Sequence, residues 1–294
     1  MSTLSTTTSG ARPASPSIGD TLYETDTKRV ITCSATGPVV WRVYDSDGVA
    51  YSTAGTDELN YPTGLWSSAG ATYYLSVSPE MHFDATIMDG SDSDNNPADA
   101  GAVALWGDRS GSTPNYDATQ GTAGSQPAWD ASGSGGKPAI VCDTDFLDLA
   151  TLYSPSSSFT QITVSKSDIA TGTSPIAWNG AWQNTIWLKY SSNNGDYTVA
   201  GNRGNLSTVN AVNMHTVKRD GTAVVLYQAG GTSLGNWTSS ATMKVDRIAK
   251  SSLQSHLGDI SEILIFDSAL SVAHLNVVRL YLTNKYGLTT GAFS

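Results

Sequence analysis

Charged side chains are scarce in this sequence of 294 residues, at 14% of the chain, against about 25% in an average soluble domain. Only 16 residues are Lys or Arg, and the formal net charge is −10. Because phosphate binding needs clustered Lys and Arg, this balance argues against nucleic acid as a partner. Ser, Thr, Gly and Asn are abundant instead, which is typical of a β-rich extracellular or virion protein.

The chain also lacks long apolar runs, a basic and apolar leader, and a cysteine framework. No run of about 18 apolar residues occurs, so we expect no membrane insertion. The first 20 residues do not have the pattern of an export signal, so a surface protein of this kind would leave its cell by lysis or by a dedicated secretion system. Cys33 and Cys142 lie far apart, and two free thiols are expected rather than a disulfide.

Glutamate is rare, which limits the enzymes that this chain can be. Glycoside hydrolases need two carboxyl groups on one face, roughly 5–10 Å apart, and no two glutamates fall in one predicted strand. Asp259 and Glu262 are three positions apart and would point to opposite faces. We therefore predict no catalytic residue, and a structural Glu262 that accepts hydrogen bonds from a neighbouring loop, from Arg219 or from Arg247. The four glutamates are Glu24, Glu58, Glu80 and Glu262.

Composition divides the chain into four parts. Residues 1–20 are rich in Ser, Thr and Pro and are predicted to form a flexible arm. Residues 21–60 contain two short β-hairpins, and residues 61–80 are a linker with scattered aromatic side chains. Two such hairpins bury too little apolar surface to stand alone, so we expect them to pack on the larger domain, residues 81–294, or on copies of themselves.

Short strand-like runs recur in residues 81–294, and Gly, Asn and Asp turns separate them. This spacing predicts an all-β fold, an antiparallel jelly-roll sandwich. The clearest hairpin contains Asp220 and Gly221, a dipeptide that predicts a type I′ turn. Near the end of the chain, GDISEILIFD is apolar on both faces, which predicts a central strand covered on both sides. Simple alternation puts Ile260 on the face of Glu262.

A single helix is predicted to follow that strand. Ser271 is a suitable N-cap, and Gly287 ends the helical pattern. Between them one apolar stripe recurs at helical spacing and is expected to pack on the sandwich. The stripe consists of Val272, Leu275, Val278 and Leu282.

Several segments resemble, in the same order, the concanavalin A-like lectin/glucanase superfamily, in particular its LamG-type jelly-roll domains of bacterial and phage surface proteins. The resemblance covers about residues 82–288 and implies two curved antiparallel sheets. The segments are HFDATI (82–87), AVALWGDRSG (102–111), the run 116–149, VKRDGTAVVLYQAG (217–230) and GDISEILIFDSALS (258–271).

The N-terminal hairpins are similar to the hairpin repeats of phage tail-fibre and virion-attached proteins. The pattern occurs only once, and Pro38 departs from it. The resemblance implies an attachment or oligomerisation element, and a homotrimer is the expected assembly. Its matching residues are Arg12, Pro13, Pro16, Leu22, Tyr23 and Trp41.

Aromatic and amide side chains crowd the segment AWNGAWQNTIWLKY (177–190). Rings flanked by amides suit a stacked sugar with hydrogen-bonded hydroxyls, and the same rings could fill the core or face a neighbouring subunit. The candidate carbohydrate or partner-binding residues are Trp182, Asn179, Asn184 and Tyr190.

Acidic side chains gather in the segment MDGSDSDNNPAD (88–99) and could offer oxygen ligands to Ca²⁺. The spacing does not match an EF-hand, and a solvated acidic turn is the alternative. The sequence predicts no other cofactor. The candidate ligands are Asp89, Asp92, Asp94 and Asp99.

These observations favour a non-enzymatic phage virion structural protein on the particle surface, as a capsid decoration, head fibre or knob anchored by its N-terminal region. Its expected partners are its own copies and capsid or tail components. The alternative is a tail-fibre receptor-binding protein that recognises host surface glycan. A polysaccharide-degrading enzyme is a third reading.

Overall fold

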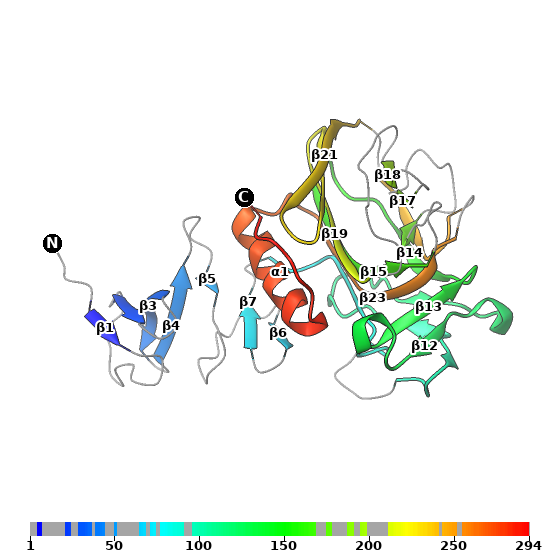
Figure 1. The fold of residues 1–294 in the computed structure, drawn as a ribbon, viewed down its shortest axis with the longest axis horizontal. Coiled ribbons are helices and arrows are strands. Elements are labelled where there is room, and N and C mark those ends of the chain that lie inside the picture. Colours follow the sequence, from blue (N-terminus) through cyan, green and yellow to red (C-terminus); the bar gives the residue numbers. More distant parts are fainter. Residues whose placement is uncertain are drawn as a thin grey trace. The chain divides into compact units, whose positions relative to one another are not determined.

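The structure of the chain is a computed structural model (Figure 1). It describes residues 77–90, 96–168, 175–177, 211–240, 243–251 and 255–293 in full. Elsewhere it describes the backbone of strands at 5–7, 21–24, 29–36, 39–44, 50–51, 65–68, 71–74, 187–190 and 195–198. The chain divides into two compact units, of which one contains residues 79–270 and 286–294 and the other contains residues 1–78 and 271–285.

The unit of residues 79–270 and 286–294 contains two antiparallel sheets arranged as a sandwich, which confirms the predicted all-β class. The larger sheet has the order β21-β20-β19-β15-β23-β13-β12-β9, and β8 pairs with β23. Its strands are β8 (Met81–Asp84), β9 (Gly101–Ala102), β12 (Ala128–Asp130), β13 (Ala139–Asp143), β15 (Phe159–Ser167), β19 (Asn213–Asp220), β20 (Ala223–Gln228), β21 (Thr232–Thr238) and β23 (Leu257–Phe266). The smaller sheet has the order β10-β11-β14-β22-β16, with β10 (Leu105–Trp106), β11 (Ala118–Thr119), β14 (Leu147–Tyr153), β16 (Ile176–Ala177) and β22 (Val245–Ile248).

Strand β23 lies in the middle of the larger sheet, as predicted. It pairs with β15 on one side and with β13 and then β8 on the other, and all its residues except Leu257 are buried. A β-bulge interrupts the alternation, because Val164 pairs with Glu262 whereas Ser165 pairs with Ile260. Ile260 therefore belongs to the apolar core and does not share the face of Glu262, so that part of the prediction was wrong.

The face of the larger sheet that carries the core packs around large aromatic side chains. Phe83 and Trp106 are fully buried, with ring centroids 5.4 Å apart. The indole Nε1 of Trp129 donates a hydrogen bond of 2.8 Å to the carbonyl of Ala85. Cys142 is a free, buried thiol as predicted, and burial raises its pKa; the side chain of Cys33 lies outside the described residues.

The β19–β20 hairpin has a different turn from the one predicted. Asp220 pairs with Ala223, so only Gly221 and Thr222 form the loop. Gly221 has a φ of 59°, whereas Thr222 is not among the residues with positive φ. A glycine with positive φ at the first central position defines a type II′ turn rather than type I′. The prediction was wrong because Asp220 is the last paired residue of the strand and not part of the loop.

The N-terminal region forms a five-stranded sheet of order β1-β2-β3-β4-β5. Both predicted hairpins are present, since Tyr23 pairs with Val30 and Tyr44 with Ala50. The structure adds β1, which pairs in parallel with β2, and the hairpin of β6 and β7 in the segment 61–80. Strand β1 was not predicted, because its residues are Ser and Thr and show no apolar alternation. The strands are β1 (Ser5–Thr7), β2 (Thr21–Glu24), β3 (Arg29–Thr36), β4 (Val39–Tyr44), β5 (Ala50–Tyr51), β6 (Leu65–Ser68) and β7 (Ala71–Tyr74).

Helix α1 (Val272–Tyr286) is the predicted C-terminal helix. The backbone N–H of His274 donates to the Ser271 hydroxyl at 3.2 Å, which confirms the N-cap, and Gly287 ends the helix with a φ of 65°. Of the predicted stripe, Val272 is 39% exposed and does not belong to it. Leu275, Val278 and Leu282 are buried, and their packing on the sandwich stays a prediction. Among the described residues, no helix has the length and hydropathy of a membrane span.

After the helix, residues 287–293 form a C-terminal strap on the β20–β21 turn. The backbone N–H of Gly291 donates to Ala229 and its carbonyl accepts from Gly231, both at 2.9 Å. The Phe293 ring meets the Tyr227 ring edge to face, with centroids 5.0 Å apart. The strap therefore completes the edge of the sandwich at this turn.

We expect Gly231→Ala to detach the strap. A Cβ at this position would lie 1.8 Å from the carbonyl oxygen of Ala292, which is backbone and cannot move without breaking the strap. Overpacking of this kind destabilises a fold by about 1–3 kcal/mol. Urea denaturation measures the loss. Gly121→Ala is the control, because no atom lies within 4 Å of a Cβ there, and equal stability of the two variants would contradict the role of the strap.

Candidate functional site

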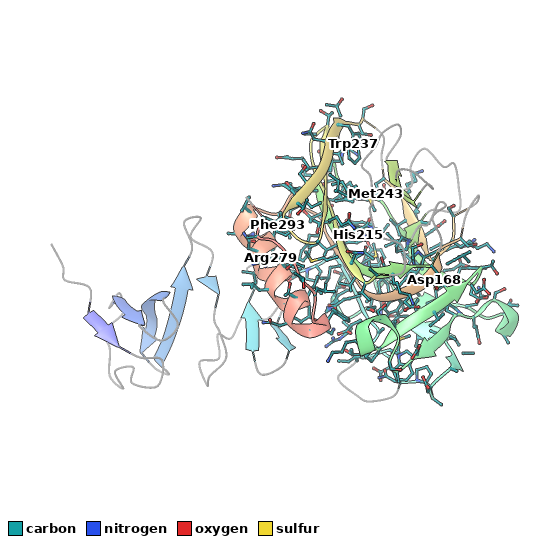
Figure 2. The ribbon with its side chains drawn as sticks, in the orientation of Figure 1. Asp168, His215, Trp237, Met243, Arg279 and Phe293 are labelled. Atoms are coloured by element: carbon teal, nitrogen blue, oxygen red, sulfur yellow. The ribbon has the colours of Figure 1, made fainter. Side chains whose placement is uncertain are left out.

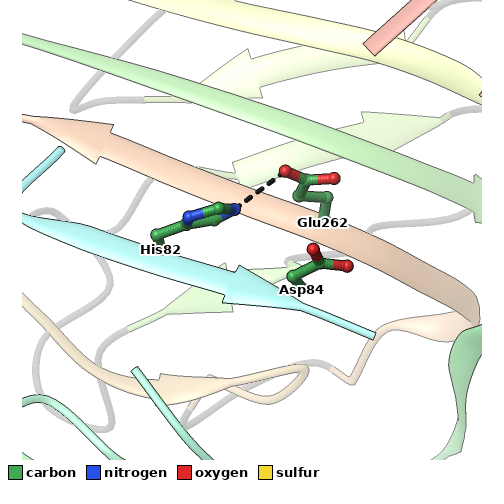
Figure 3. A group of neighbouring side chains, drawn as sticks. All are labelled: His82, Asp84 and Glu262. Carbon is green, nitrogen blue, oxygen red and sulfur yellow. Dashed lines mark hydrogen bonds and ion pairs between the residues drawn. The ribbon is translucent and has the colours of Figure 1, made fainter. Parts of the chain in front are cut away.

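Strands β8 and β23 bring three ionisable side chains together, His82, Asp84 and Glu262 (Figure 3). Asp84 pairs with Glu262, and His82 precedes Asp84 by two residues, on the same face of β8. One ligand atom of each residue lies within 4.8 Å of the others. All three side chains are buried, with exposed fractions of 3%, 2% and 1%. We call this group the acid–histidine cluster.

Both carboxylate oxygens of Glu262 accept hydrogen bonds. His82 Nε2 lies 2.9 Å from Oε1, and the Tyr286 hydroxyl donates to Oε2 at 2.8 Å. The same hydroxyl lies 3.2 Å from the carbonyl of Ser261. A buried carboxylate is stable only with such partners. Glu262 therefore joins the first strand of the sandwich to the residue that ends α1.

The predicted arginine partners of Glu262 were wrong, although its structural role agrees with the contacts. Arg219 donates instead to the carbonyls of Gly221 and Ser239, at 2.8 and 3.0 Å. Arg247 donates to Asp148 at 2.6 Å. Both arginines come from strands at a distance from β8, so tertiary pairing and not residue type selected His82 as the partner.

Asp84 is held by donors on both of its oxygens. Arg109 Nη1 donates to Oδ2 at 2.8 Å, while the backbone N–H and hydroxyl of Thr86 donate to Oδ1 at 2.9 and 2.7 Å. The loop that carries Arg109 is fixed to β8 a second time, because His82 N–H donates to Asp108 at 2.9 Å. The cluster thus connects two strands and a loop.

The convergence of Asp84 and Glu262 was not expected from the sequence, because comparison within one strand does not detect residues from opposite ends of the domain. Glycoside hydrolases typically use two neighbouring carboxyl groups for catalysis. Here each oxygen already accepts a hydrogen bond and both side chains are at most 2% exposed. A substrate therefore has no access to them. A metal ion is also unfavourable here, because the positive charge of Arg109 already lies beside Asp84 and would repel a cation.

A sequence signal for the cluster did exist. His82 and Asp84 belong to the segment HFDATI, and Glu262 to GDISEILIF. Both segments carry the resemblance to the concanavalin A-like superfamily. Their polar residues interrupt otherwise apolar strands, and buried polar residues are expected to find one another.

The structure describes none of the side chains of the predicted carbohydrate and attachment residues. Tyr190 ends β17 (Trp187–Tyr190), which pairs with β18 (Gly195–Thr198). Leu22, Tyr23 and Trp41 belong to β2 and β4, and only their backbone is described. The other predicted residues lie outside the described residues; they are Trp182, Asn179, Asn184, Arg12, Pro13 and Pro16.

The predicted calcium segment is described in part. Asp99 is exposed and accepts a hydrogen bond of 3.1 Å from the N–H of Ala131, and Asp89 is half-buried. Asn96 fixes the segment by bonds of 2.9 Å to the backbone of Thr86 and Met88. Asp92 and Asp94 lie outside the described residues. Calcium binding stays a prediction, and melting curves with calcium and with a chelator would test it.

A second polar group, which the sequence analysis missed, lies on the inner face of the larger sheet. Strand β15 begins there with the apolar Phe159, but the next four side chains on that face are polar and buried. The register adds His215 beside Thr163, and Gln228 beside His215. We call this group the inner polar stripe; it consists of Gln161, Thr163, Ser165, Ser167, His215 and Gln228.

Two buried histidines lie at this end of the sheet (Figure 2 labels His215). Burial, with a smaller contribution from His256, lowers the pKa of His215 to about 3. Burial lowers the pKa of His256 to about 4, partly offset by a bond of 3.3 Å to the carbonyl of Asp259. Both imidazoles are therefore neutral at pH 7.

Comparison with known proteins shows the fold and no family. No family model matches the sequence, and no curated protein does. An arabinofuranosidase solved with arabinofuranosyl-α-1,2-xylobiose is 13% identical, with a TM-score of 0.50 over 78% of this chain and 62% of that chain. This chain therefore spans less than two thirds of that enzyme, and the likeness shows the β-sandwich alone.

Smaller lectin-type jelly-roll domains are also similar. A heptameric SAP-like pentraxin from Limulus polyphemus is 13% identical, with a TM-score of 0.39 over 51% of this chain and 81% of that chain. The CBM40 domain of a Ruminococcus gnavus IT-sialidase, bound to α2,3 sialyllactose, is 10% identical, with a TM-score of 0.33 over 42% and 81% of the two chains. The neighbours thus include both glycan-binding domains and glycoside hydrolases.

Proposed function

We propose that this chain is a non-enzymatic structural protein of a phage particle, displayed on the virion surface as a capsid decoration, head fibre or knob. The observation that carries the non-enzymatic part is the closed acid–histidine cluster. Its two carboxylates converge in the sandwich, and donors from the protein occupy both. This pair is therefore not available to react with a substrate.

The N-terminal region is the proposed anchor. Its five-stranded sheet carries the hairpins that resemble phage-fibre modules. A sheet of this size buries little apolar surface alone, so association with capsid or tail components, and with copies of itself as a homotrimer, would stabilise it. Several weak attachments in one assembly multiply through avidity.

Localisation on the intact particle tests this proposal. Electron microscopy with an antibody against the sandwich is expected to label the head surface, and sedimentation of the purified full chain is expected to give the mass of a trimer. Absence of the protein from purified particles would contradict the virion role. Release of reducing ends from host polysaccharide by the wild type, and not by Asp84→Asn, would contradict the non-enzymatic role.

The second candidate is a tail-fibre receptor-binding protein that recognises host surface glycan. The segment AWNGAWQNTIWLKY (177–190) favours it, because rings flanked by amides suit a stacked sugar with hydrogen-bonded hydroxyls. Label at the tail tip rather than on the head would favour this candidate.

A further inference from the structure

The β19–β20 turn contains an Asp–Gly pair, and a hydroxyl group bonds to both of its reactive groups. The Ser158 hydroxyl donates a hydrogen bond of 3.3 Å to Oδ1 of Asp220 and accepts one of 3.2 Å from the backbone N–H of Gly221. Asp220 is exposed, whereas Ser158 and Gly221 are half-buried. One hydroxyl therefore contacts the side-chain carboxylate and the backbone nitrogen that follows it, at a place that water reaches.

Strand pairing and a local turn hold Ser158 in this position. Strand β15 begins at Phe159, which pairs with Arg219, so Ser158 lies beside Asp220 when this register continues by one residue. The Ser156 hydroxyl donates to the Ser158 carbonyl at 3.0 Å and accepts from the Ser158 N–H at 3.3 Å. The backbone of Ser158 is thus fixed on both sides, as a group that transfers a proton requires.

Gly221 leaves its backbone nitrogen open to attack on the carboxyl carbon. A Cβ at this position would meet no atom within 4 Å, so a new ring has room here. The φ of 59° also favours glycine, which has no side chain to shield the nitrogen. Arg219 Nε donates to the Gly221 carbonyl at 2.8 Å. This bond fixes the turn and places a positive charge beside the residue whose nitrogen would lose a proton.

We propose that Asp220–Gly221 is a self-modifying site, at which Asp220 isomerises to isoaspartate through a cyclic succinimide. The Gly221 nitrogen bonds to Cγ of Asp220 and passes its proton to the Ser158 hydroxyl, which passes its own proton to Oδ1. The Cγ–Oδ1 bond then breaks, and this oxygen leaves as water with a second proton from solvent. Water next adds to the backbone carbonyl carbon of Asp220 and breaks its bond to the Gly221 nitrogen. The chain is then linked through Cγ, and the former backbone carbonyl is a carboxylate.

The product changes the hairpin without a change of mass or net charge. Isoaspartate adds one carbon atom to the main chain at the last paired residue of β19, where Asp220 pairs with Ala223. The bond from Ser158 to the side-chain carboxylate is lost at the same time. The turn therefore changes its shape as the protein ages. This inference does not depend on the virion role, because the reaction needs only this chain and water.

Storage of the purified full-length chain at pH 7, in water labelled with heavy oxygen, tests the proposal. Each cycle of ring formation and hydrolysis incorporates one labelled oxygen atom. Mass spectrometry of the fragmented peptide locates this label and distinguishes isoaspartate from aspartate, and we expect both signals at position 220. Ser158→Ala should slow the reaction about tenfold or more, because a positioned proton-transfer group accelerates a reaction by about 10²–10⁴. Ser158→Thr keeps the hydroxyl and should restore most of the rate.

Asp89–Gly90 is the internal control in the same sample. A Cβ at Gly90 would lie 3.0 Å from the backbone of Gly107, so a ring has little room there. We expect almost no label at position 89 in the wild type or in the Ser158 variants. Absence of label at position 220, equal labelling at positions 89 and 220, or a rate that Ser158→Ala leaves unchanged or increases would overturn the inference.

Discussion

Glu262→Ala is expected to lower the free energy of unfolding of the sandwich by roughly 2–6 kcal/mol, about 1–3 kcal/mol for each of the two buried groups that lose their hydrogen-bond acceptor. The variant leaves His82 and the Tyr286 hydroxyl without the carboxylate that accepts from them. Glu262 is 1% exposed, so water does not replace it. Urea denaturation at pH 7 measures the change, and the melting temperature should fall by about 10 °C for a domain of this size.

Two further variants separate the contributions within the cluster. Tyr286→Phe removes one donor and is expected to lower stability by about 1–3 kcal/mol. Glu262→Gln keeps the volume and one acceptor, so its effect should lie between those of Glu262→Ala and the wild type. If Glu262→Ala left stability unchanged while abolishing an activity on polysaccharide, the structural role of this residue would be refuted.

Acidification is expected to destabilise the wild type through His215 and His256. In the unfolded chain both histidines bind protons near pH 6.5, whereas in the fold their pKa values are about 3 and about 4. The fold therefore binds fewer protons than the unfolded chain between pH 6.5 and pH 3. Their contribution to stability is complete above pH 6.5 and decreases as the pH falls through this window, by about 1.4 kcal/mol for each histidine per pH unit.

His215→Gln should reduce this pH dependence. Glutamine is uncharged at every pH and keeps hydrogen-bonding groups, so the difference in unfolding free energy between variant and wild type should shift in favour of the variant between pH 7 and pH 4. Urea denaturation at a series of pH values measures the difference. His256→Gln should reduce the slope in the same direction, because burial also lowers the pKa of His256. A constant difference between His215→Gln and the wild type would contradict the assignment.

The order and type of most elements follow from local chemistry. Alternating apolar residues in ILIF predicted the central strand, and Ser271 with Gly287 predicted both ends of the helix. Each of these signals lies within a few residues of the element that it predicts. The predicted turn was one residue too early. Strand pairing decides whether Asp220 or Thr222 accompanies Gly221 in the loop, and the structure has Thr222 there.

The candidate site was not predictable in the same way. His82 and Glu262 are 180 positions apart, and their hydrogen bond depends on the pairing of the first and last strands of the sandwich. From residue types alone, Arg219 and Arg247 were equally plausible partners of the Glu262 carboxylate. The inner polar stripe also required tertiary structure, because alternation along β15 does not tell which face is covered by the second sheet.

By itself, the sequence determined an all-β chain with a low charge density, a covered final strand and one C-terminal helix, because composition, alternation and capping act over short distances. Only the tertiary structure decided that Asp84 and Glu262 are enclosed by donors and that Gln161 and Thr163 face inward. Partners, burial and access depend on strand order and register, which bring distant parts of the chain into contact.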